Sequence, residues 1–182
     1  VVVTTYSGKD SIIAINQDKE IDLVLMDIDL GKGIDGTEAA KKILEIRPIP
    51  IIFLTSHSEK EMVDKVRNIT RYGYVLKNSG EFVLLSSINM AFELFTAHQE
   101  LEKSQYKFNY MFHNSPNGIA VFKSFKNGKN FIFKEINNTA EKMDSINRQD
   151  IIGQKVTEVF PGVKDFGLFE IFQNVWRTGK SQ

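Results

Sequence analysis

Three side chains that could take part in phosphoryl chemistry each come directly after a run of apolar residues. They are the carboxylate Asp27, the hydroxyl Thr55 and the ammonium Lys77. A carboxylate can attack phosphorus when a hydroxyl and an ammonium group offset the charge on the transferred oxygens. The three residues therefore form a candidate phosphoryl-accepting site, provided that the fold brings them together.

The elements that must position these residues alternate between strand and helix. Strands are predicted at 1–5, 21–26, 51–54 and 72–76, and helices at 10–17, at 37–46 with Asp35 as the N-cap, and at 58–69. This alternation favours an α/β fold with a parallel sheet and helices on both faces. Because ligands bind beyond the carboxyl ends of such strands, Asp27, Thr55 and Lys77 are expected to meet at one edge.

The second half of the chain has a different pattern. A helix is predicted from residue 80 to 114, followed by two strands, 119–125 and 131–136, that a turn at 126–129 joins. Short helices are predicted around 139–143 and 166–177. The long helix carries a stripe at three-and-four spacing that suits pairing with a second helix; the alternative is packing on its own domains. The members of this stripe are Met90, Leu94, Ala97, Leu101, Ser104, Phe108 and Met111.

A glycine pattern offers an alternative of another class, a dinucleotide-binding enzyme. Residues 31–36 match G-x-G-x-x-G between a strand and a helix. However, Asp27, Asp29 and Asp35 would repel a pyrophosphate at this position, and Thr55 stands where the fingerprint requires an acidic residue. The pattern therefore favours the carboxylate interpretation.

Residues 1 to about 95 resemble the receiver domain of two-component response regulators. The motifs that carry the resemblance are D-L-V-L-M-D, I-D-G-T-E-A-A, I-I-F-L-T-S and Y-G-Y-V-L-K. The resemblance implies a flavodoxin-like, doubly wound parallel sheet. It also implies that the partner is a histidine kinase or a phosphotransfer protein.

The same resemblance assigns roles to individual residues. Asp27 would be the phosphoacceptor, Thr55 the switch hydroxyl, Lys77 the ion-pair partner of the phosphoryl group and Tyr74 the aromatic switch. The cofactor would be Mg²⁺, held by Asp27 and the backbone carbonyl of Asp29.

Two departures from the family pattern bear on this site. The family carries a first strand, its helix and an acidic pair before the position of Val1, so the remaining acidic Mg²⁺ ligands are absent from this chain. Phosphorylation of the chain alone is therefore expected to be poor. Asn78 follows Lys77 where the family usually has proline, which leaves the shape of that loop open.

Residues 105–182 resemble the front half of a PAS sensor domain, an α+β fold. The motifs are F-H-N-S-P-N-G-I-A-V-F, E-I-N-N-T-A-E-K-M, I-I-G-Q-K-V-T-E-V-F-P and V-W-R-T-G-K. The absence of cysteine excludes a cysteine-linked flavin, and the ligand is otherwise unknown. An apolar pocket is one interpretation of the aromatic and aliphatic residues, and simple core packing is the other. The pocket candidates are Phe122, Phe133, Ile152, Phe169 and Trp176.

These resemblances predict the domain organisation. A receiver domain at 1–95 shares its last helix with a connecting helix, 80–114, which leads to a PAS-like domain at 105–182. A homodimer through the helix 80–114 is expected. The parent is expected to be a sensor histidine kinase with its catalytic core after Gln182, so this chain is not itself expected to be an enzyme. The alternative within signalling is a receiver that is never phosphorylated and serves in docking or dimerisation.

The composition adds few constraints. The chain has 23 basic and 23 acidic residues, which gives no general attraction to nucleic acid or to an anionic membrane surface. No apolar run has the length of a membrane helix, and a cytoplasmic location is the default expectation. The histidines His57, His98 and His113 are interpreted as a loop residue, a helix-face residue and a helix-end residue.

Overall fold

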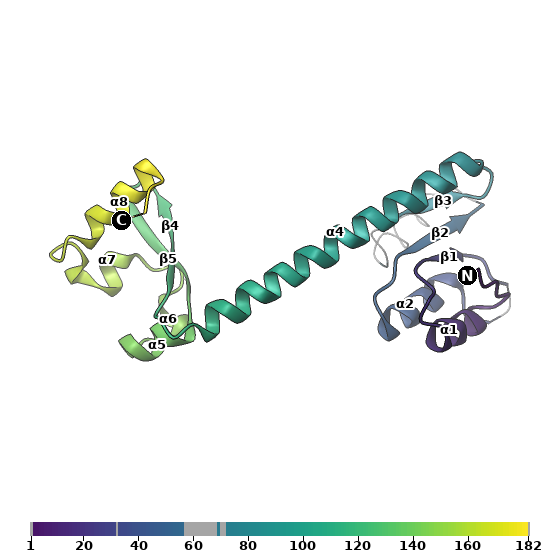
Figure 1. Ribbon diagram of the computed structural model, residues 1–182, viewed down its shortest axis with the longest axis horizontal. Coiled ribbons are helices and arrows are strands. Elements are labelled where there is room, and N and C mark those ends of the chain that lie inside the picture. Colours follow the sequence, from purple (N-terminus) through teal and green to yellow (C-terminus); the bar gives the residue numbers. More distant parts are fainter. Residues whose placement is uncertain (1, 32, 57–68, 70–71, 182) are drawn as a thin grey trace. The chain divides into compact units, whose positions relative to one another are not determined.

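The computed structural model describes residues 2–31, 33–56, 69 and 72–181. The chain divides into two compact units, one ending at Glu102 and the other beginning at Lys103. Figure 1 shows the elements of both units along the chain. The predicted helix 58–69 lies outside the described residues except for Ile69.

The first unit contains a three-stranded parallel sheet in the order β1-β2-β3. Its strands are β1 (Val24–Asp27), β2 (Ile51–Thr55) and β3 (Tyr74–Leu76). Val24 pairs with Ile51 and Phe53 pairs with Tyr74, so all three strands run in the same direction and end at the same edge. The predicted parallel sheet is confirmed for this part of the chain.

Two helices of the described residues cover one face of this sheet. They are α1 (Gly8–Gln17), with Ser7 as N-cap, and α2 (Gly36–Ile46), with Asp35 as N-cap. The apolar stripe of α2, with Ala39, Ala40 and Ile43, packs in one buried cluster with strand residues such as Phe53. Burial of this stripe holds α2 against the sheet.

The opposite face of the sheet is covered by the first turns of α4 (Glu81–Asn114). Ala91 is fully buried, and it forms a cluster with Ile52 and Val75 of the sheet. Ile52 points away from the face that Phe53 occupies, as the alternation along a strand requires. Helices therefore lie on both faces, as the doubly wound arrangement predicts.

The predicted strand at residues 1–5 is wrong for the described residues 2–5, which have no regular structure. Their β-branched side chains favour an extended chain, but a strand forms only when a neighbour completes its hydrogen bonds. No described strand pairs with this segment, and β1 has β2 as its partner on one side only. Residues 2–5 and the residues of β1 line the same apolar cavity of about 440 Å³.

The second unit contains an antiparallel hairpin and a series of short helices. The strands β4 (Ala120–Phe125) and β5 (Asn130–Ile136) confirm the predicted hairpin. The helices α5 and α8 agree with predicted helices. The sequence pattern does not predict α6, α7 or the 3₁₀ helix η1, because three or four residues are too few to show a helical periodicity of apolar residues. The helices are α5 (Asn138–Asp144), α6 (Arg148–Ile151), α7 (Val156–Val159), η1 (Pro161–Val163) and α8 (Leu168–Thr178).

A buried amide, that of Asn137, connects the parts of the second unit. Asn137 is 0% exposed, and its Oδ1 accepts hydrogen bonds from the backbone N–H groups of Ile119 and Ala140, both at 2.9 Å. Its Nδ2 donates to the carbonyls of Phe112 and Asn117 at 2.9 and 2.8 Å. The last turn of α4, the start of the hairpin and the N-terminus of α5 are thus held by one side chain.

Across the described part of the chain, no helix has the length and apolar character needed to cross a membrane.

Candidate functional site

The carboxyl edge of the first unit's sheet carries the three residues that the sequence singles out. Asp27 is the last residue of β1, Thr55 is the last residue of β2, and Lys77 directly follows β3. The N–H of Lys77 donates to the carbonyl of Thr55 at 2.9 Å, which extends the ladder to the strand ends. The fold therefore brings these three residues to one edge, as predicted.

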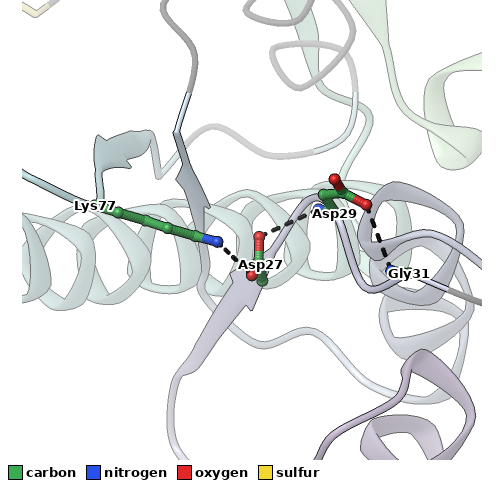
Figure 2. A network of polar contacts seen from close by, with 4 residues as sticks. All are labelled: Asp27, Asp29, Gly31 and Lys77. Carbon is green, nitrogen blue, oxygen red and sulfur yellow. Dashed lines mark hydrogen bonds and ion pairs between the residues drawn. The ribbon is translucent and has the colours of Figure 1, made fainter.

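Asp27 and Lys77 form a direct ion pair. The Nζ of Lys77 lies 2.6 Å from Oδ2 of Asp27, and the other carboxylate oxygen, Oδ1, accepts a hydrogen bond from the N–H of Asp29 at 3.2 Å. Figure 2 shows Lys77 and Asp29 on opposite sides of the Asp27 carboxylate. The Asp27 side chain is 31% exposed, so it is both fixed in orientation and accessible to a reagent.

Thr55 and Tyr74 have different surroundings. Thr55 is 5% exposed, which places this switch candidate within the packed end of β2. Tyr74 is 44% exposed and begins β3, at the opposite end of that strand from Lys77. Three residues of strand span about 10 Å, so the Tyr74 backbone lies away from the edge where Asp27 and Lys77 meet.

The described residues do not by themselves fit a Mg²⁺ site. Mg²⁺ requires a near-octahedral set of oxygen ligands, usually with carboxylates among them. Within the described ranges, no group of three or more histidine, cysteine, aspartate or glutamate residues could hold a metal ion. The carboxylate of Asp29 accepts a hydrogen bond from the N–H of Gly31 at 3.4 Å.

Gly36 is a positioning residue that the sequence interpretation missed. A Cβ atom at this position would lie 1.9 Å from the carbonyl oxygen of Asp27, so the close approach of α2 to the end of β1 requires glycine. The N–H of Gly36 donates to the carbonyl of Ile28 at 3.0 Å. The I-D-G-T-E-A-A motif contains this glycine, but its spacing alone does not reveal a backbone contact.

The glycine pattern over residues 31–36 has a structural explanation without a nucleotide. Gly31 and Gly33 adopt φ values of +76° and +111°, and Gly36 makes the close contact just described. Asp35 caps α2, since its Oδ1 accepts from the N–H of Glu38 at 2.8 Å. Its carboxylate occupies the helix terminus that would have to receive a pyrophosphate, which disfavours the dinucleotide alternative.

The second unit contains an apolar cavity of about 470 Å³. Phe122 and Phe133, two of the predicted pocket residues, line it. The other three lie outside its lining: Phe169 packs in the buried cluster of the unit, Ile152 is 40% exposed, and Trp176 covers the hairpin turn at Gly128. Asp144 is the one carboxylate among the lining residues that the structure describes.

Two of the three histidines fall within the described residues. The Nε2 of His98 lies 3.3 Å from the carboxylate of Glu102 one turn later on α4. The ring of His113 contacts the guanidinium of Arg148, with 3.0 Å between Nδ1 and Nη2. His57 lies outside the described residues.

Fold and site together define the class of protein. A flavodoxin-like parallel sheet presents an accessible aspartate, paired with a lysine, at its carboxyl edge. Residues 1–89 match the family model of the response regulator receiver domain. This part of the chain belongs to that family, and the chain therefore carries a receiver domain of two-component signalling.

The chain is also similar to a curated protein and to solved structures, in each case over part of its length. The transcriptional regulatory protein PdtaR of Mycobacterium tuberculosis is 32% identical over 81 residues, which cover 44% of this chain and 39% of that regulator. The N-terminal domain of a response regulator/sensory box/GGDEF protein from Carboxydothermus hydrogenoformans is 40% identical, with a TM-score of 0.47, and the match covers 50% of this chain and 74% of that one. A fusion containing the trimeric coiled coil of yeast Spc42 is 34% identical with a TM-score of 0.55, covering 60% and 70% of the two chains.

Proposed function

We propose that Asp27 is the phosphoacceptor of this receiver domain. The observation that carries the proposal is the contact between Lys77 and the Asp27 carboxylate, 2.6 Å from Nζ to Oδ2, at an edge where Asp27 is 31% exposed. An oxygen of Asp27 attacks the phosphorus of a phosphohistidine in a kinase or phosphotransfer protein. The P–N bond breaks, its electron pair stays on the imidazole nitrogen, and the ammonium of Lys77 offsets the charge on the transferred group.

The proposed response to phosphorylation begins at the same edge. A phosphoryl group adds roughly two negative charges, which strengthen hydrogen bonds from Lys77 and from the hydroxyl of Thr55. Thr55 is the proposed switch residue and Tyr74 the proposed aromatic switch. Movement of Thr55 within a packed strand end shifts the equilibrium between two receiver conformations.

For the second unit we propose a PAS-like sensor module, with the parent protein acting as a sensor histidine kinase. The hairpin β4–β5 followed by α5, α6, α7 and α8 supports this proposal, as does the cavity beside Phe122 and Phe133. Its ligand would be predominantly apolar, because aliphatic and aromatic side chains together dominate the lining. We also propose that α4 joins two copies of the chain.

The phosphoacceptor assignment is tested by intact-mass measurement of the full-length protein after incubation with acetyl phosphate and Mg²⁺. We expect the mass of one phosphoryl group to be gained, and the gain to disappear in Asp27→Asn. Asp29→Asn is the matched control, because it removes a neighbouring carboxylate that is not proposed to react. A gain that survives Asp27→Asn would contradict the assignment.

A second function within signalling is a receiver that docks or dimerises without phosphate. The exposed apolar residues of α4, among them Leu94 and Leu101 at 51% and 54% exposure, favour it. The same measurement separates the two functions, because a docking receiver would gain no mass under any condition while its α4-mediated association persisted.

A further inference from the structure

The long helix α4 carries an apolar stripe that its own units leave exposed. The stripe, here called the seam, alternates steps of four and three residues from Met90 to Met111. Its large members are 51–71% exposed, and Ala97 and Ser104 are exposed as well. The seam consists of Met90, Leu94, Ala97, Leu101, Ser104, Phe108 and Met111.

Within each unit, α4 packs through a face other than the seam. Ala91 is 0% exposed against the sheet of the first unit, and Phe112 is 5% exposed in the second. In heptad terms, Leu94, Leu101 and Phe108 occupy a positions, whereas Ala91 and Phe112 occupy e positions. The exposure of the seam is therefore not explained by the packing of α4 on its own units.

The size and spacing of the seam fit a second copy of the same helix. Its side chains expose on the order of 600 Å² per copy, against roughly 800 Å² per partner in a standard interface. Strict four-and-three spacing maintained over 22 residues of helix, from 90 to 111, is the repeat that keeps a seam facing one partner helix. A seam of this kind is self-complementary.

We propose that two copies of α4 form a parallel, in-register coiled coil in which Ser104 faces Ser104 of the partner copy. This deepens the proposed homodimer by fixing its orientation and register, and it rests on that part of the proposed function. It does not depend on phosphorylation of Asp27.

Ser104 is the main argument for the parallel arrangement. As the one polar member of the seam, it meets an identical hydroxyl in a parallel pair, so each can donate to or accept from the other. Two antiparallel registers each align six of the seven seam residues, and in them Ser104 faces Leu94 or Leu101 of the partner copy instead. A polar residue that pairs favourably only with the same residue of the partner copy fixes the register of the two helices.

The flanking charges distinguish the arrangements only weakly. In a parallel pair Glu93, at a g position, lies beside His98 at the e position of the partner copy, and Glu100 lies beside Gln105. Of the two antiparallel registers, one places Glu100 beside Glu100 of the partner copy and Glu93 near Lys107, and the other places Glu100 beside Lys107. Exposed pairs of either sign contribute little in water, so the buried serine layer decides between the arrangements.

The chain contains no cysteine, so single cysteines report the geometry directly. We would oxidise the Ala97→Cys and Ser104→Cys variants of the full chain and measure disulfide dimer on non-reducing gels. Facing d positions in a parallel pair bring the Cα atoms within the range a disulfide spans, about 4.4–6.8 Å. We expect both variants to cross-link at least ~10-fold faster than Gln99→Cys, which lies on the outer face of the helix.

An antiparallel pair gives a different result, because Ala97 then faces Leu101 or Phe108 of the partner copy. Faster cross-linking of Ala97→Cys in a mixture with Leu101→Cys or with Phe108→Cys than in any of these variants alone would overturn the proposal. Equal rates for Gln99→Cys and Ser104→Cys, or a monomeric mass by light scattering for the unmodified chain, would also overturn it. Neither outcome would bear on whether Asp27 accepts phosphate.

Discussion

The ammonium nitrogen of Lys77 lies 2.6 Å from a carboxylate oxygen of Asp27, although the two residues are 50 positions apart in the sequence. Both side chains remain partly exposed, at 41% and 31%. An ion pair in such a position contributes about 0–1 kcal/mol to stability. The contact therefore bears on the chemistry of Asp27 more than on the folding of the domain.

Replacing Lys77 is expected to separate its effect on the phosphorylation of Asp27 from its effect on the stability of the domain. In Lys77→Met the free energy of unfolding should change by less than about 1 kcal/mol. Phosphorylation of Asp27 in the full-length protein should fall at least ~10-fold, because charge on the transferred oxygens is no longer offset. Mass spectrometry and denaturant unfolding measure the two quantities.

Lys42→Met is the matched control for Lys77→Met. It removes an exposed lysine that pairs with Glu38 at 3.0 Å on α2, away from the strand ends. It should leave phosphorylation unchanged. Unaltered phosphorylation in Lys77→Met would contradict the proposed role of Lys77.

A methyl group at position 36 is expected to disturb the end of β1. The Cβ of Gly36→Ala would overlap the carbonyl oxygen of Asp27, 1.9 Å away, so α2 and the strand end must move apart. We expect a loss of roughly 2–3 kcal/mol in the free energy of unfolding. In Gly31→Asn, where nothing lies within 4 Å and asparagine tolerates the left-handed backbone, the loss should stay below about 1 kcal/mol. Similar losses of stability in Gly36→Ala and Gly31→Asn would contradict the proposed effect of the close contact between residue 36 and the Asp27 carbonyl.

Removal of the buried amide in the second unit should be among its most damaging single changes. Asn137→Ala leaves two carbonyls and two N–H groups without their partner. We expect a loss of at least roughly 3 kcal/mol in stability, measured by denaturant unfolding of the full chain. Asn147 is the control: it caps a helix through a single hydrogen bond, which its Oδ1 accepts from the N–H of Gln149. Asn147→Ala should cost only about 1 kcal/mol.

One carboxyl group has a shifted titration that can be measured directly. The hydrogen bond from the Lys155 ammonium lowers the pKa of the Glu158 carboxyl below its ordinary value. Because the folded-state pKa is the lower one, the interaction is fully present above the ordinary carboxyl pKa and is lost as the pH falls through the folded-state pKa. Carboxyl NMR titration should show the pKa of Glu158 rising in Lys155→Gln. No rise would contradict the assigned cause.

The elements that the sequence predicted well are those with a strong local signal. The helix α2 has an aspartate cap, a continuous apolar stripe and a proline just beyond its end, so its limits follow from residues within one window. The hairpin turn at 126–129 is similarly local. By contrast, residues 2–5 have strand-like side chains, yet a strand also requires a partner that local sequence does not reveal.

Within the site, the strand ends were predictable and the backbone contacts were not. The position of Lys77 beside Asp27 follows from parallel strands ending at one edge. The approach of Gly36 to the Asp27 carbonyl depends on three-dimensional packing, as does the contact of Arg148 with His113 in the second unit. A glycine spacing alone does not distinguish a ligand-binding turn from a close helix-strand contact, so Gly36 matches a nucleotide-binding pattern although it serves a backbone contact.

The one-sided pairing of β1 has a consequence for handling the chain. A strand whose second side meets no neighbour among the described strands offers a template on which another molecule can add its own strand, and Leu25 there is 40% exposed. Concentrated solutions of the chain are therefore expected to aggregate through the edge of β1 that does not pair with β2. A charged gatekeeper such as Leu25→Lys should delay the onset of turbidity.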